Sequence, residues 1–192
     1  MSPHLNKSLT IIELLIAVSI FALIVVGFSN IDTFSRYHVI TSDKKAKLQN
    51  DASYVLEHMT KEINKAIGDV NQSEPAVSVT TIDSDPAIIA WIDYNQNGKR
   101  DSAPSDRRIA YRYRSSPDYQ MRYYSDYSGS PTSYEIISRK ISAFSRSLTD
   151  NYVFVEITTC DDPDGSLAAC GTLDNPQLTM KNRIYMPAVS TH

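Results

Sequence analysis

The fold of this chain is decided by residues 9–28, which read LTIIELLIAVSIFALIVVGF. A helix of about 20 apolar residues is long enough to cross a bilayer, and the only polar side chain between Leu14 and Phe28 is that of Ser19. One carboxylate, Glu13, interrupts the stretch. An ionised group in hydrocarbon is unfavourable by roughly 2.5 to 3.5 kcal/mol even on insertion scales. The sequence therefore predicts a membrane helix whose one acid needs a partner or a function.

The residues before this helix form a short, ordered motif. A basic residue (Lys7), a small residue (Ser8) and an apolar residue (Leu9) precede the run Thr-Ile-Ile-Glu-Leu-Leu, which ends at Leu15. No Ala-x-Ala cleavage site follows the apolar stretch, as an ordinary secretory signal would require. The motif resembles the N-terminal signal of type IV prepilins and type II secretion pseudopilins. The chain departs from the usual pattern of that family at two positions, because the family has Gly in place of Ser8 and Phe in place of Leu9.

The resemblance implies cleavage between Ser8 and Leu9 by a prepilin peptidase, which leaves the apolar segment on the mature protein. Serine is still small enough for a tight peptidase site. The family methylates the new amine, here that of Leu9, and in a filament this cation would pair with Glu13 of a neighbouring subunit. Such pairing would set the axial register, because an unpaired buried charge costs more than a paired one. The alternative is a plain signal anchor in which the Glu13 side chain reaches the membrane interface. On that reading, the motif from Lys7 to Leu15 would be a coincidence.

The rest of the chain suits one globular domain behind the anchor. At 192 residues, with 42% hydrophobic and 21% charged residues, the chain has room for one anchor and one modest domain. We expect a cytoplasmic leader over residues 1–8, a transmembrane and assembly helix over 9–30, an amphipathic soluble half of the helix over 31–68 and a β-rich headgroup over 69–192. Leu48, Val55 and Ile63 belong to an apolar stripe with three- and four-residue steps. Gly68 predicts the end of the helix.

Beyond residue 68 the pattern changes to short strands separated by prolines. The candidate strands are Ala76–Ile82, Ala87–Ile92, Arg108–Arg114, Tyr134–Ile141 and Tyr152–Thr158. A long N-terminal helix packed on an antiparallel sheet is an α+β fold, and the same order is the ladle architecture of the pilin family. Residues 54–68 and 108–113 are also similar to the W/J class of minor pilins and pseudopilins.

The sharpest local motif in the headgroup is DYNQNGKRD, residues 93–101. Oxygen ligands stand at loop positions 1, 3, 5 and 9, which are Asp93, Asn95, Asn97 and Asp101. Gly98 permits the sharp turn at position 6 and the carbonyl of Lys99 can serve position 7, as in a calcium loop. Position 12 is Pro104 rather than a bidentate Glu, and the nearest carboxylate is Asp106. A calcium ion bound here would stiffen the loop. The alternative is a polar hairpin without a metal, with a tight turn at Asn97-Gly98.

The two cysteines, Cys160 and Cys170, enclose a short polar segment. A chain exported across a bacterial inner membrane meets oxidising conditions, so we expect a disulfide between them. For so short a loop the chain-entropy account gives roughly 2 to 3 kcal/mol of stabilisation. A metal site is the alternative, and the scattered positions of the four histidines do not support it.

Arginines alternate with apolar and aromatic residues in Arg108–Arg114. Arg112 and Arg114, which stand beside tyrosines, can bind nucleic acid through phosphate contacts and base stacking. The period of two is also that of a half-buried strand, with Ile109 and Tyr111 on one face and the arginines on the other. We favour the strand and expect no DNA partner, because a formal net charge of −3 argues against bulk attraction to nucleic acid.

Catalytic motifs are missing from the sequence, which has no Gly-x-Gly-x-x-Gly or Walker loop and no Gly-x-Ser-x-Gly elbow. We therefore expect a structural subunit without enzyme activity. The resemblance implies a minor pilin or pseudopilin that primes or caps a type IV pilus or a type II secretion pseudopilus, beside other minor subunits and the major subunit. Residues 9–28 would hold it in a bacterial inner membrane before assembly, with the headgroup in the periplasm or outside. The alternative is a membrane-anchored binding module, either a calcium-stabilised adhesin or a DNA-uptake receptor.

Overall fold

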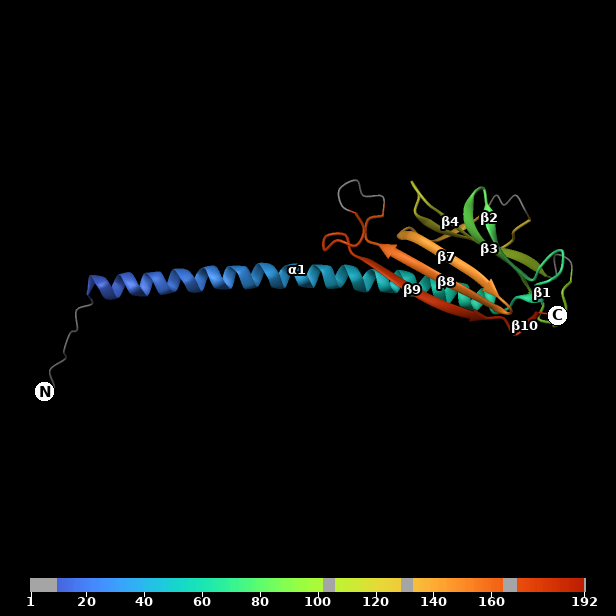
Figure 1. Cartoon of the computed structure of the whole chain (residues 1–192), viewed down its shortest axis with the longest axis horizontal. Helices are drawn as coiled ribbons and strands as arrows, with labels where there is room; N and C mark the ends of the chain where they lie inside the picture. The colour runs from blue at the N-terminus through green and yellow to red at the C-terminus, as the bar shows by residue number, and fades with distance from the viewer. Residues whose placement is uncertain (1–9, 102–105, 129–132, 164–168, 192) are drawn as a thin grey trace. The chain divides into compact units, whose positions relative to one another are not determined.

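The computed structural model describes residues 10–101, 106–128, 133–163 and 169–191 (Figure 1). Helix α1 (Ile11–Ile63) comes first, and strands follow it. The strands are β1 (Ile67–Asp69), β2 (Val77–Ile82), β3 (Asp85–Ile92), β4 (Arg107–Arg114), β5 (Gln120–Tyr124), β6 (Glu135–Ser138), β7 (Ile141–Thr149), β8 (Tyr152–Cys160), β9 (Gln177–Tyr185) and β10 (Ala188–Ser190). The chain divides into two compact units, Met1–Ser42 and Asp43–His192, and the second is called the head unit below. The fold is α+β, with an N-terminal helix and antiparallel sheets.

Helix α1 ends at Ile63 rather than at the predicted Gly68. The backbone amides of Lys65 and Ala66 bond to carbonyls three residues earlier, which tightens the last turn and satisfies two helix-end carbonyls. Ala66 then bridges to Ile92 of β3, and Gly68 lies inside β1 with a backbone φ of 120° that glycine tolerates best. The predicted helix end at Gly68 is wrong, because residues 66–68 pair with strands and the helix ends before them.

The strands form three sheets. β2 to β6 make an antiparallel sheet in sequence order, and β7, β8 and β9 make a second antiparallel sheet. β1 and β10 pair in parallel, with Ile67 opposite Ala188. The predicted antiparallel arrangement therefore describes the two larger sheets, and the small parallel pair was not anticipated.

Each of the five predicted strand segments contains a strand, and one of them is split. The segment Tyr134–Ile141 holds β6 and only the first residue of β7, because β6 ends at Ser138. Strands β1, β5, β9 and β10 and most of β7 lie outside the predicted segments. The sequence therefore predicted the centre of the five-stranded sheet and missed much of the three-stranded sheet.

The main core of the head unit lies between the C-terminal part of α1 and the inner faces of the sheets. Leu48, Val55 and Ile63 are fully buried, which confirms the apolar stripe. Figure 1 shows β8 and β9 running alongside this part of α1. The side-chain amide of Asn182 on β9 also donates a hydrogen bond to the Thr60 hydroxyl at 2.8 Å. The helix thus contributes one side of the core.

Strand β4 is buried on both faces, so the prediction of a half-buried strand is wrong. Ile109, Tyr111 and Tyr113 face the main core, as their spacing predicted. The opposite face carries Ala110, which belongs to a smaller apolar cluster with residues of β2, β3 and β5, and Arg112, which is only 5% exposed. Side chains from neighbouring strands pack around Ala110 and two aspartates of the β2–β3 hairpin bind Arg112, so this face is not open to solvent as expected.

Candidate functional site

The first turn of α1 carries Glu13, with Thr10 just before the helix. The backbone N–H of Glu13 donates a hydrogen bond to the Thr10 hydroxyl at 3.3 Å. Thr followed three residues later by Glu is the capping-box pattern that starts helices, and a first-turn carboxylate is also favoured by the helix dipole. The sequence spacing Thr-x-x-Glu was the signal for this cap, and reading Glu13 only as a membrane acid missed it. The predicted cleavage residues Ser8 and Leu9 lie outside the described residues.

The part of α1 that follows Glu13 exposes its apolar side chains. The large hydrophobic residues from Ile11 to Ile40 are all exposed, and the helix is long and apolar enough to cross a membrane. The hydroxyl of Ser19 donates to the carbonyl of Leu15 at 2.8 Å, so it leaves no free donor in an apolar surrounding. Within the described ranges the Glu13 carboxylate forms no ion pair. Among the described residues at the start of this apolar surface, Glu13 is therefore the one charged side chain without an ion-pair partner.

The predicted calcium loop is wrapped around its own polar side chains. The Asp93 carboxylate accepts hydrogen bonds from the backbone N–H groups of Asn97 at 3.1 Å and Gly98 at 2.8 Å. The side-chain oxygens of Asn95 and Asn97 accept from the backbone N–H groups of Asn97 and Lys99. Gly98 has a backbone φ of 75°, in the region where a side chain is strained. Residues 93–99, which follow β3, are thus bonded to the oxygens that the sequence singled out.

The carboxylate of Asp106 bonds to the backbone near both ends of residues 93–101. It is fully buried and accepts hydrogen bonds from the backbone N–H groups of Tyr94 at 3.1 Å and Asp101 at 2.6 Å. Asp101 in turn accepts from the side-chain amides of Asn95 and Asn97. Position 12, Pro104, lies outside the described residues. The sequence had identified Asp106 only as the nearest carboxylate, without a role.

The side-chain and backbone oxygens of this loop are of the chemical type that a hard cation prefers as ligands. Calcium prefers carboxylate, amide and carbonyl oxygens, and the loop offers those of Asp93, Asn95, Asn97, Asp101 and the Lys99 backbone. Across the described segments, no group of three or more His, Cys, Asp or Glu side chains is placed to hold a metal. Amide oxygens must therefore complete the shell, and both amide groups now donate to Asp101. Calcium binding here requires the side-chain oxygens of Asn95 and Asn97, which now accept backbone N–H groups of the loop, to contact the ion as well.

Calcium is expected to stabilise the head unit through this loop. At 100 times its dissociation constant a ligand adds about 2.7 kcal/mol, which raises the melting temperature by roughly 5 to 11 °C for a chain of this size. The only tryptophan, Trp91, should report the same event, because the guanidinium of Arg100 lies 4.4 Å from its ring centre. The measurement compares melting and tryptophan fluorescence in EDTA and in calcium chloride. An Asp93→Ala variant should show neither change, and an unaltered wild type would contradict the site.

Arg112 and Arg114, the predicted nucleic-acid contacts, are bound to carboxylates. The Arg112 guanidinium donates to Asp85 at 2.7 and 2.9 Å and to Asp83 at 2.7 Å. Arg114 lies 3.5 Å from Asp85 and 3.3 Å from Asp118. Burial lowers the pKa of Arg112, but the bonds to Asp85 and Asp83 outweigh it and raise the pKa overall. A buried arginine held by two aspartates is not placed to bind phosphate, so this geometry argues against the nucleic-acid alternative.

The predicted disulfide between Cys160 and Cys170 is present, which confirms that pairing and leaves no thiols for a metal. Beside it, Asp161 forms ion pairs with Lys44 of α1 at 2.9 Å and with Lys140 at 3.0 Å. The hydrogen bond from Lys44 holds the pKa of Asp161 below its ordinary value. The disulfide loop is therefore tied to the helix within the head unit.

His58 on α1 is packed among tyrosines of the large sheet. Its ring lies 4.8 Å from that of Tyr123, and its Nδ1 lies 2.8 Å from the Tyr111 hydroxyl. The same hydroxyl lies 3.2 Å from the carbonyl of His58, so it is within hydrogen-bond distance of both the ring and the backbone of this residue. Burial lowers the pKa of His58, against the opposing charges of Glu62 and Glu135. The fold thus favours the neutral imidazole.

The head unit should lose stability as the pH falls below about 6.5, where an unfolded histidine takes up a proton. The folded chain resists that proton, so the unfolded chain binds more protons and the free energy of unfolding decreases with falling pH. His58→Gln does not titrate and keeps an amide beside Tyr111, so we expect it to flatten this part of the profile. Urea unfolding between about pH 5 and pH 7.5 measures both profiles. An equal dependence of the free energy of unfolding on pH in the two proteins would contradict the assignment of this effect to His58.

Comparison with known proteins adds no relative: no family model matches the sequence, no curated protein matches it, and no solved structure matches the fold. The functional argument therefore depends on the residues and contacts of this chain.

Proposed function

We propose that the chain is a minor pilin or minor pseudopilin, a structural subunit that primes or caps a type IV pilus or a type II secretion pseudopilus. The observation that carries the proposal is the start of α1. Glu13 is an acid without an ion-pair partner in the described chain, at the head of an exposed apolar helix that follows Lys7, Ser8 and Leu9 in the order of a prepilin signal.

Cleavage between Ser8 and Leu9 supplies the missing partner. It creates an amine on Leu9, close in sequence to Glu13, and both charges are unfavourable in hydrocarbon. When a subunit joins a filament, its amine meets Glu13 of the neighbouring subunit, and each charge offsets the desolvation of the other. A prepilin peptidase is therefore the first partner, and the next are the other minor subunits and the major subunit.

The anchor and the head unit support the same role. The apolar surface of residues 9–28 suits a bacterial inner membrane before assembly and a filament core after it. The C-terminal part of α1 packs on antiparallel strands, which is what the ladle architecture of pilins requires. The resemblance of residues 54–68 and 108–113 to the W/J class favours a minor subunit. The head unit would then contact other minor subunits in the periplasm or outside the cell.

The capping box gives Glu13 a competing role that the proposal has to exclude. A first-turn Glu can be explained by helix initiation alone, because a Glu at this position of a capping box can accept the N-cap backbone N–H, and its negative charge is favourable at the positive end of the helix dipole. Gln at the same position also satisfies a capping box but carries no charge. Glu13→Gln therefore separates the two roles, and its incorporation into filaments sheared from the native cell is the experiment that tests the proposal.

A further inference from the structure

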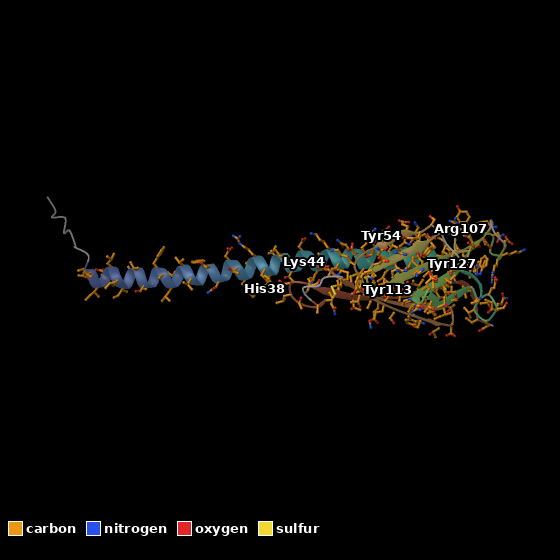
Figure 2. All side chains as sticks on the ribbon, turned by 90° about the horizontal axis from the view of Figure 1, so that it is seen from above. His38, Lys44, Tyr54, Arg107, Tyr113 and Tyr127 are labelled. Atoms are coloured by element: carbon orange, nitrogen blue, oxygen red, sulfur yellow. A yellow bond between two sulfur atoms is a disulfide. The ribbon has the colours of Figure 1, made fainter. Side chains whose placement is uncertain are left out.

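Deamidation of an asparagine side chain to a carboxylate is a spontaneous modification, and residues 97 and 98 form its most reactive sequence. Asn97 is the one asparagine of the chain that precedes a glycine. Glycine has no side chain to obstruct its backbone nitrogen, which is the atom that attacks the asparagine amide. Both residues are exposed, and Figure 2 shows Arg107, which begins β4 after this loop, at the end of the head unit opposite Lys44. Water and base therefore reach the pair directly.

The reaction needs only water and base. Once the backbone nitrogen of Gly98 has given its proton to hydroxide, it bonds to the side-chain carbonyl carbon of Asn97 and closes a succinimide ring. The bond from that carbon to Nδ2 breaks, and Nδ2 takes up a proton from water and leaves as ammonia. Another water molecule then opens the ring. Attack at the side-chain carbonyl carbon gives aspartate, and attack at the backbone carbonyl carbon gives isoaspartate.

The hydrogen bonds of the loop hold this reaction back. The Gly98 N–H donates to the Asp93 carboxylate at 2.8 Å, so a deprotonated nitrogen would face a like charge. The Asn97 side chain is restrained at both ends, because its Oδ1 accepts from the Lys99 N–H at 2.7 Å and its Nδ2 donates to Asp101 at 2.6 Å. Burial adds no protection, since a Cβ on Gly98 would meet no atom of the described residues within 4 Å, its chain neighbours aside. The site is therefore guarded by bonds that break when the loop opens locally.

The aspartate product changes the ligands that the loop offers to calcium. Residue 97 holds position 5 of the calcium-loop pattern, and its Nδ2 now bonds to Asp101. A carboxylate in place of that amide would lie beside a like charge, which repels it in the absence of a cation, and would add to the carboxylates of Asp93 and Asp101. The calcium affinity of such loops depends on the number of charged ligands. We propose that Asn97 is a deamidation site gated by its own loop, and that its aspartate product binds calcium more tightly than the asparagine form.

The first experiment locates the modification. The full chain in neutral detergent is incubated in EDTA at mildly alkaline pH, and its peptides are mapped by mass spectrometry. Asn95 is the internal control, because it is exposed in the same loop but precedes Gln96. Asn97 should convert at least about tenfold faster than Asn95, and part of the product should be isoaspartate, which direct hydrolysis of the amide does not form. No conversion at Asn97, equal conversion of the two asparagines, or a product without isoaspartate would overturn the assignment.

The second experiment tests the gate. Asp93→Ala removes the carboxylate that holds the Gly98 N–H and should convert at least about threefold faster than wild type. Glu156→Ala is the matched control, since it removes a carboxylate that pairs with Lys181 in the three-stranded sheet, and it should convert at the wild-type rate. Wild type in urea should also convert faster than the folded chain, which keeps the test valid if Asp93→Ala unfolds. Equal rates in folded and urea-treated wild type, an unchanged rate in folded Asp93→Ala, or equal gains in both variants would contradict the gate.

The third experiment measures how the product binds calcium. Asn97→Asp has the same covalent structure as the aspartate product, and calorimetric titration of the full chain gives its dissociation constant for calcium. It should bind calcium at least about tenfold more tightly than wild type, and in EDTA it should melt at a lower temperature than wild type. Asn97→Gln keeps an amide without a charge and should not bind calcium more tightly. A dissociation constant of Asn97→Asp that is no lower than that of wild type would overturn the role given to the product.

Discussion

Replacing Glu13 by Gln is expected to remove the chain from assembled filaments while leaving α1 and the head unit folded. The substitution keeps the capping box but leaves the amine of the incoming Leu9 without a carboxylate. Breaking a buried ion pair from one side costs about 3 to 5 kcal/mol, so the assembled fraction should fall by well over tenfold. Filaments are sheared from cells and the chain is quantified in the sheared and membrane fractions.

Thr10→Ala is the matched control for this experiment. It removes the hydroxyl that accepts from the Glu13 N–H, which costs about 0.5 to 2 kcal/mol of helix stability, and it keeps the carboxylate. We expect this variant to assemble. If Glu13→Gln assembled like wild type, or if both variants failed equally, the acid would be a helix cap and no filament contact.

Replacing Asp85 by Asn is expected to destabilise the head unit by about 3 to 5 kcal/mol, because it leaves Arg112 buried without a full counter-charge. The Arg112 side chain is 6% exposed and that of Asp85 is 15% exposed, so water cannot take over the lost interaction. Asp85 also lies 3.5 Å from Arg114, which loses a partner as well. Urea unfolding measures the loss as a lower midpoint with an unchanged slope.

Asp83→Asn is the matched control on the same hairpin. The Asp83 side chain is 76% exposed although it contacts Arg112 at 2.7 Å, and an exposed partner contributes about 1 kcal/mol or less. Its φ of 47° also suits Asn, so the backbone is not strained by the change. The double variant Asp85→Asn with Arg112→Met should recover most of the loss, because the buried guanidinium that lacked its carboxylate is gone and the Asp83 carboxylate left behind is exposed. Similar losses in the Asp83 and Asp85 variants would contradict the buried ion pair.

The helix and the central strands could be predicted because their signals are local. The apolar stripe through Leu48 and Ile63 and the alternation in β4 both follow from the repeat of one element. Two of the missed strands break that repeat. β7 has a register shift between Ile141 and Ala143, which changes the phase of its side chains, and β9 has the polar Asn182 at an inward position, where Thr60 accepts its hydrogen bond.

Other features could not be predicted because they depend on distant residues. β1 and β10 are three residues long, and each is stabilised by pairing with the other across most of the chain. The burial of Arg112 depends on Asp83 and Asp85, which a separate strand pair places beside it. Local alternation shows which side chains share a face of β4, but it does not show that both faces are covered.

The candidate sites also divide into those with a local sequence signal and those that depend on residues far apart in the sequence. The loop oxygens from Asp93 to Asp101 were visible because a calcium loop is contiguous in sequence. Asp106 was visible only as a nearby carboxylate, since its bonds to Tyr94 and Asp101 form in the folded loop. The cavity lined by His58, Tyr94 and Arg107 had no sequence signal, because residues of α1, of three strands and of the segment after β3 build it together.

The mass of the N-terminal peptide from the native cell tests the central claim most directly. The account predicts a mature chain that begins at Leu9 with a methylated amine, because that amine is the partner Glu13 requires. A mature protein that retains Met1 to Ser8, or one that is cut after the apolar segment, would contradict it.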